Sequence, residues 1–91
     1  MKELFEILLW IIGAILVGVA VVAVLDYLDE QEAKKNIREQ FGNTIGAEIK
    51  KIAKKGDVKR ITFADLQSDK EFAIDARSLD SSIREGAKIY I

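Results

Sequence analysis

An uninterrupted apolar run near the N-terminus constrains this chain more than any other feature. The run extends from Ile7 to Leu25 and contains no charged side chain. As a helix its 19 residues would be about 28 Å long, close to the roughly 30 Å hydrocarbon core of a bilayer. The sequence therefore predicts a single transmembrane helix, with residues 1–25 forming a membrane anchor.

Two other interpretations of the run are weaker. A signal peptide has an apolar region of about 7–15 residues behind a basic segment, whereas this run is longer and follows only Lys2. The V-x-A triplet at residues 21–23 nevertheless keeps cleavage open as an alternative. A buried helix of a soluble domain is disfavoured, because the remaining residues are too few to surround a helix that is apolar on every side.

The anchor contains one candidate contact with a second helix. Ala14 and Gly18 have the small-x-x-x-small spacing that lets two membrane helices approach closely. Small residues are also common in unpaired membrane helices. Helix pairing through these two residues is therefore one hypothesis for how the chain self-associates.

Basic residues near the run predict its orientation in the membrane. Only Lys2 precedes the run, whereas three basic residues follow it closely, namely Lys34, Lys35 and Arg38. Basic residues are retained on the cytoplasmic side of membrane helices. The C-terminal part of the chain is therefore expected to be cytoplasmic.

The segment after the run is rich in helix-forming residues. From Asp26 to Phe41 it contains no glycine, and the following Gly42 can adopt the backbone conformation that ends a helix. We expect residues 26–43 to continue the membrane helix as a charged stalk with its cap. Its apolar stripe of Ala33, Ile37 and Phe41 is too short for a coiled coil and should pack on the domain that follows.

From residue 44 to residue 91 the apolar residues change to a period of two, which is typical of strands. Four short alternating sets are present: Ile45, Ala47 and Ile49; Ile61 and Phe63; Phe72, Ile74 and Ala76; Ala87, Ile89 and Ile91. The segment 77–86 is expected to contain one helical turn with Leu79 and Ile83 inward. The overall prediction is an α+β chain whose residues 44–91 form a four-stranded antiparallel meander, an SH3-like or OB-like half-barrel.

The first hairpin of this meander has a specific predicted register. Gly56-Asp57 is a tight-turn candidate, and a two-residue turn there pairs Lys54 with Lys59 and Ile52 with Ile61. Ile49 then reaches the core side opposite Phe63 only if one extra residue is inserted at Lys50-Lys51. The sequence therefore predicts a β-bulge at that point.

The residue inventory argues against an enzyme. The chain contains neither histidine nor cysteine, which removes imidazole bases, thiolate nucleophiles and the usual zinc ligands. The carboxylates Asp75 and Asp80 fit no calcium-loop pattern and are expected to be solvated. The chain contains neither of the glycine-rich phosphate-binding motifs, G-x-G-x-x-G and G-x-x-x-x-G-K-[ST]. Neither a cofactor nor a metal site is expected.

Positive charge is concentrated in the hairpin, which is the candidate interaction site. Residues 34–60 carry nine basic and three acidic groups, and the hairpin holds six of the basic ones: Lys50, Lys51, Lys54, Lys55, Lys59 and Arg60. Such a cluster is either solvated or contacts a negatively charged partner. In the predicted pairing Lys51, Lys55 and Arg60 face outward on one side of the hairpin.

Three functions are compatible with these features. The first is a non-enzymatic single-pass membrane protein whose small β-domain is an interaction module, as an accessory or scaffold subunit of a membrane complex or as a homo-oligomer. The alternative is binding of anionic lipid headgroups through the basic hairpin. Nucleic-acid binding by an OB-like face is disfavoured, because Phe63 and Phe72 are expected in the core and only Tyr90 could stack on a base.

Overall fold

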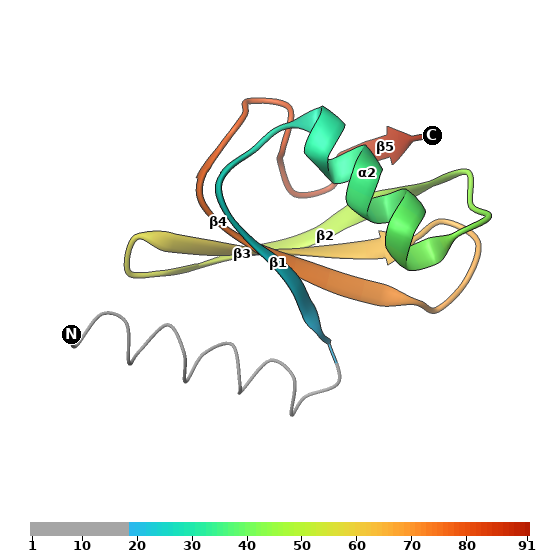
Figure 1. The fold of residues 1–91 in the computed structure, drawn as a ribbon, viewed down its shortest axis with the longest axis horizontal. Coiled ribbons are helices and arrows are strands. Elements are labelled where there is room, and N and C mark those ends of the chain that lie inside the picture. Colours follow the sequence, from blue (N-terminus) through green and yellow to red (C-terminus); the bar gives the residue numbers. More distant parts are fainter. Residues whose placement is uncertain (1–18) are drawn as a thin grey trace.

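The computed structural model describes residues 19–91, which form an α+β domain with one helix and a five-stranded mixed open sheet (Figure 1). In chain order the elements are β1 (Val21–Leu28), α2 (Glu30–Phe41), β2 (Gly46–Lys55), β3 (Val58–Asp65), β4 (Glu71–Leu79) and β5 (Lys88–Tyr90).

The sheet has the strand order β1-β4-β3-β2-β5. Strands β2, β3 and β4 form an antiparallel meander, and β5 returns to pair with β2 in antiparallel orientation. Strand β1 adds to the other side of the meander and is parallel to β4. The sheet is open, with β1 and β5 as its two edges.

The first strand corrects the prediction for the apolar run. Residues 7–18 lie outside the described part of the chain, but Val21 to Leu25 belong to β1 and pair with β4 instead of continuing a membrane helix. A parallel strand that packs on a core has the same continuously apolar composition as a membrane span. Within residues 19–91, no helix combines the length and the apolar composition needed to cross a bilayer.

The helix begins four residues later than predicted. Asp26 to Leu28 complete β1, and Asp29 caps α2 by accepting a 2.9 Å hydrogen bond from the backbone N–H of Glu32. Gly42 ends the helix with φ of 67° and donates its N–H to the carbonyl of Arg38, as predicted. The chain therefore has no upright stalk from residue 26, because a strand and a helix cap occupy that segment.

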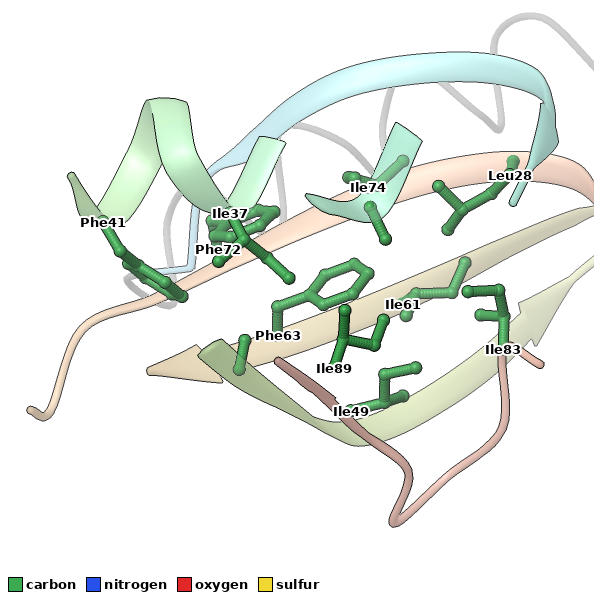
Figure 2. Close-up of a cluster of buried hydrophobic side chains, with 13 residues drawn as sticks. Leu28, Ile37, Phe41, Ile49, Ile61, Phe63, Phe72, Ile74, Ile83 and Ile89 are labelled. Carbon is green, nitrogen blue, oxygen red and sulfur yellow. The ribbon is translucent and has the colours of Figure 1, made fainter. Parts of the chain in front are cut away.

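The apolar stripe of α2 packs on the sheet, which confirms its predicted role. Ala33 and Ile37 are fully buried. The Phe41 ring packs against the Phe72 ring in a tilted arrangement, with 5.0 Å between the ring centroids. Figure 2 shows Ile37 and Phe41 pointing toward the side chains of the sheet. The helix covers one face of the sheet and supplies the core that a 48-residue β-domain alone would lack.

The core lies between α2 and this face of the sheet (Figure 2). Alternate residues of each strand contribute to it, with Phe63 stacked on Phe72 at 5.0 Å between ring centroids. The predicted inward positions at the strand centres are buried: Ala47, Ile49, Ile61, Phe63, Phe72, Ile74, Ala76 and Ile89. Strand β1 contributes Leu28, which is fully buried, and the crossing segment contributes Ile83.

The predicted hairpin register is confirmed in full. Across the Gly56-Asp57 turn Lys54 pairs with Lys59 and Ile52 with Ile61. The register shifts between Ile49 and Lys51, which places Ile49 opposite Phe63 as the predicted bulge requires. The hairpin is therefore a feature that local sequence pattern determines.

Two further predictions for the β-domain need correction. The sheet contains a fifth strand, β1, and is mixed instead of purely antiparallel. The segment between β4 and β5 contains turns and no helical turn, because β4 continues to Leu79 and Asp80 begins a hydrogen-bonded turn that places Ile83 in the core.

Candidate interaction surface

The sheet has two ends with different character. The strand directions bring the start of β1, the start of β2, the start of β4 and the end of β5 to one end, which we call the tether end because the apolar run joins it. The β2–β3 turn lies at the other end, which we call the hairpin tip. Figure 1 shows this tip at the left, with the β3–β4 connection and the C-terminus at the right.

The hairpin presents the lysines that the sequence singled out, with Lys54, Lys55 and Lys59 beside the turn and Lys50 and Lys51 near the middle of β2. Lys50, Lys51, Lys54 and Lys55 are exposed, and Lys59 is half-buried. Within residues 19–91 none of these five side chains makes an ion pair. Their ammonium groups are therefore available to a negatively charged partner.

Arg60 does not share this surface, although the prediction grouped it with the lysines. Its side chain is buried and forms a bidentate pair with Asp75, with Nε 2.9 Å from Oδ1 and Nη2 3.0 Å from Oδ2. The two residues are directly opposite each other on β3 and β4. Because they alternate with Ile61 and Ile74, they lie on the sheet face opposite α2.

The expectation that Asp75 is solvated was therefore wrong. Asp75 is 0% exposed and occupies a central strand position that alternation assigns to the second face of the sheet. The signal was present in the sequence, since an acid between Ile74 and Ala76 in an apolar strand is unusual without a basic partner. Its pairing with Arg60 requires the β3–β4 register, which the sequence analysis did not derive.

An apolar corner at the tether end was not predicted. Ile45, Tyr90 and Ile91 are 53%, 59% and 45% exposed. The corner is held together by the backbone, because the N–H of Ile91 donates to the carbonyl of Ile45 at 3.0 Å and Tyr90 is the register partner of Gly46. Ile45 and Ile91 belonged to inward-facing sets in the sequence, but both lie beyond the ends of their strands and outside the core.

A polar hollow at the tether end is lined by acidic side chains. Glu48, Asp65, Asp69 and Glu71 surround it together with Lys50 and Ser68. Asp65 already accepts hydrogen bonds from Thr44 and Ser68, and the bond from Ser68, followed by that from Thr44, lowers the pKa of Asp65. No group of acidic residues within 19–91 has a metal-binding arrangement. Asp65 therefore organises the loops that it contacts.

A second exposed carboxylate closes the crossing segment. Asp80 accepts hydrogen bonds from the hydroxyl groups of Ser82 at 2.7 Å and Tyr27 at 2.8 Å. The bond from Ser82, followed by that from Tyr27, lowers the pKa of Asp80 to about 2. The Asp80 hydrogen bond in turn raises the pKa of Tyr27. These bonds join the end of β1 to the turn after β4.

The predicted helix–helix contact through Ala14 and Gly18 lies outside the described residues. Comparison with known proteins finds no family model, no curated protein and no solved structure that matches the chain.

Proposed function

We propose that the chain is a non-enzymatic, membrane-anchored interaction module. It acts as an accessory or scaffold subunit of a membrane-associated complex, and its domain is a small SH3-like half-barrel. The observation that carries the proposal is the placement of two features at opposite ends of one sheet. The apolar run joins the tether end, and the hairpin tip is surrounded by three lysines without ion pairs among residues 19–91, namely Lys54, Lys55 and Lys59. The tip is therefore free to meet a partner away from the anchor.

The SH3-like part of this proposal is supported by the strand pairing. Strands β2, β3 and β4 form a three-stranded meander. After a turn-rich crossing, β5 returns to pair with β2, the first strand of the meander, as in SH3-like half-barrels. The bulge in β2 bends this sheet toward closure. In such small barrels, loops and edges are the usual contact regions.

Strand β1 shortens the anchor that we propose. With Val21 to Leu28 held in the sheet, the apolar residues left for a bilayer are 7–20, and the charged Glu6 precedes them. A helix of residues 7–20 would be about 21 Å long, shorter than the roughly 30 Å hydrocarbon core. Local thinning of the bilayer accommodates such a mismatch at modest cost.

The charged groups of the domain support the absence of catalysis in this proposal. Asp75 is neutralised by Arg60, and Asp65 and Asp80 are hydrogen-bonded within turns. General acid–base catalysis needs a group with a pKa near the working pH, whereas Asp65 and Asp80 have lowered pKa values. These carboxylates stabilise structure.

Binding of anionic headgroups by the hairpin is the weaker candidate. From Gly46 to Lys55, β2 spans nine residue steps, about 30 Å at 3.3 Å per residue. This separates Lys54 and Lys55 at the tip from the tether end by several Debye lengths, each about 8 Å at physiological salt. An acidic protein surface therefore suits the tip better than the bilayer in which the chain is anchored.

The anchor is tested by alkaline extraction of membranes from cells that express the full chain. We expect the protein to stay in the membrane pellet, and a variant with Ile11→Arg and Leu16→Arg to move to the supernatant, because each buried charge opposes insertion. Recovery of the unaltered chain in the supernatant would rule out the anchor.

The partner is tested by crosslinking in intact membranes from a photoreactive group at position 55, at the hairpin tip. We expect a discrete protein adduct that is lost when Lys54 and Lys59 are both changed to Glu. This double change keeps a like-charge pair across the strands, so the hairpin pairing is perturbed equally. Changing Lys35 and Lys70 to Glu removes the same charge elsewhere and should leave the adduct intact. Loss of the adduct in both variants would exclude the tip as the specific site.

A further inference from the structure

The described part of the chain enters the sheet almost at its first residue. The carbonyl of Ala20 accepts a 2.9 Å hydrogen bond from the backbone N–H of Ala73, and β1 begins at the next residue. A bilayer-inserted segment that ends at Ala20 therefore holds the tether end of the sheet at the membrane surface. This step rests on the proposed membrane anchor.

The same end of the sheet presents the apolar corner. Gly46 and Tyr90 are register partners at the start of β2 and the end of β5. The corner is at one edge of the sheet and β1 is at the other, with the three strands β4, β3 and β2 between them. Four strand spacings correspond to about 19 Å. A flat surface that touches both therefore covers the whole tether end.

The residues of the corner suit the headgroup region of a bilayer. Ile45 and Ile91 are aliphatic and about half-exposed, and Tyr90 is more exposed still. Tyrosine is enriched at membrane interfaces, where the ring contacts acyl chains and the hydroxyl group stays hydrated. Exposed aliphatic side chains beside such a tyrosine lose their contact with water when they enter this region.

We propose that the apolar corner of Ile45, Tyr90 and Ile91 docks on the lipid bilayer surface, so that the sheet stands on its tether end and directs the hairpin tip away from the membrane. The acidic hollow lies at the docked end. Docking is therefore driven by apolar contact with the bilayer and is not strengthened by anionic lipid. The anchor and the corner act as two points of attachment that fix the orientation of the domain.

Depth-dependent fluorescence quenching tests this orientation. The chain has no cysteine, so Tyr90→Cys and Asp57→Cys each create a unique labelling site for an environment-sensitive fluorophore, at the corner and at the tip. The full-length protein is reconstituted into zwitterionic vesicles that carry a lipid with a spin label near the headgroup. We expect the label at position 90 to be quenched at least threefold more than the label at position 57. Ile45→Cys gives a second label at the corner with the same expectation.

The outcomes separate the orientation from the anchor. Failure of the unlabelled protein to float with vesicles would overturn the proposed anchor and this inference together. Flotation with equal quenching at both positions, or stronger quenching at position 57, would overturn the orientation alone. A label at position 90 whose emission reports shielding from water but which the lipid spin label does not quench would indicate contact with a second copy, and this result would also overturn the docking. Stronger quenching at position 57 upon addition of anionic lipid would assign the membrane contact to the lysines instead.

Discussion

The two halves of the β2–β3 hairpin are stabilised in different ways. Near the tether end Ala47 and Ile49 are fully buried in the core that α2 covers, in a stretch of β2 that lies between β3 and β5. At the tip Lys54 faces Lys59 across the strands, and the two like charges oppose the pairing. Arg60 and Asp75 mark the boundary between these halves. The comparison teaches that a charge is stabilising in this sheet only where the fold supplies an opposite charge to it.

The largest effect is expected at this boundary. Asp75→Ala should lower the free energy of unfolding by about 3–5 kcal/mol, because it leaves the buried Arg60 guanidinium without its carboxylate. Urea unfolding of the detergent-solubilised full chain measures the change. The control is Arg77→Ala, which should change the free energy of unfolding little. Arg77 forms an exposed ion pair with Asp26 at the long distance of 4.0 Å, and such surface pairs contribute little to stability.

A double variant sharpens the same comparison. Arg60→Met with Asp75→Leu replaces both charges by apolar groups and should recover most of the stability that Asp75→Ala loses. If the double variant were as unstable as the single one, the burial of the Arg60 charge without the Asp75 carboxylate would not explain the loss.

The next effect contrasts two glycines at the two ends of β2. At Gly46, φ is 151° and an added Cβ would lie 2.9 Å from the Cα of Tyr90, so Gly46→Ala should cost about 2–3 kcal/mol. At Gly56, φ is 62° with open space around it, so Gly56→Ala should cost only about 1 kcal/mol. Thermal unfolding of the two variants compares them directly. Equal losses would mean that the contact with β5 contributes nothing.

A smaller effect of opposite sign is expected at the tip. Lys54→Glu converts the like-charge pair with Lys59 into an opposite-charge pair and should stabilise the domain by roughly 0.2–1 kcal/mol at low salt. The gain should shrink as salt is added, because the side chain of Lys54 is exposed. Urea unfolding at two salt concentrations is the measurement, and destabilisation by Lys54→Glu would contradict the assigned repulsion.

The smallest effect is a pH dependence from an exposed carboxylate. The pKa of Asp80 is lowered from 3.8 to about 2, so its hydrogen bonds stabilise the folded state above pH 3.8 and this contribution is lost as the pH falls toward 2. Asp80→Asn should therefore be less stable than the unaltered chain at neutral pH. The difference should shrink between about pH 4 and pH 2, which unfolding curves across this range can follow. A constant difference would assign the effect to packing instead of ionisation.

Local pattern was sufficient for the antiparallel part of the fold. The turn at Gly56-Asp57, the bulge after Ile49 and the stripe of α2 were all predicted, because each depends on residues close in sequence whose period identifies the buried face. The lysine tip follows from the same register. Its exposure could be anticipated, since lysine side chains are almost never fully buried unless they are paired.

The sequence by itself therefore determined the hairpin, the cap and the inward face of α2, and the inward residues at the centres of the antiparallel strands. Only the tertiary structure decided that Val21 to Leu28 form a strand, because their apolar composition suits a bilayer and a sheet equally and the partner strand is about fifty residues away. The ion pair of Arg60 with Asp75 depends on the β3–β4 register, and the exposure of Ile45 and Ile91 depends on where β2 begins and β5 ends. Long-range pairing assigns these residues their surroundings, and those surroundings decide which charges are paired and which apolar side chains remain exposed.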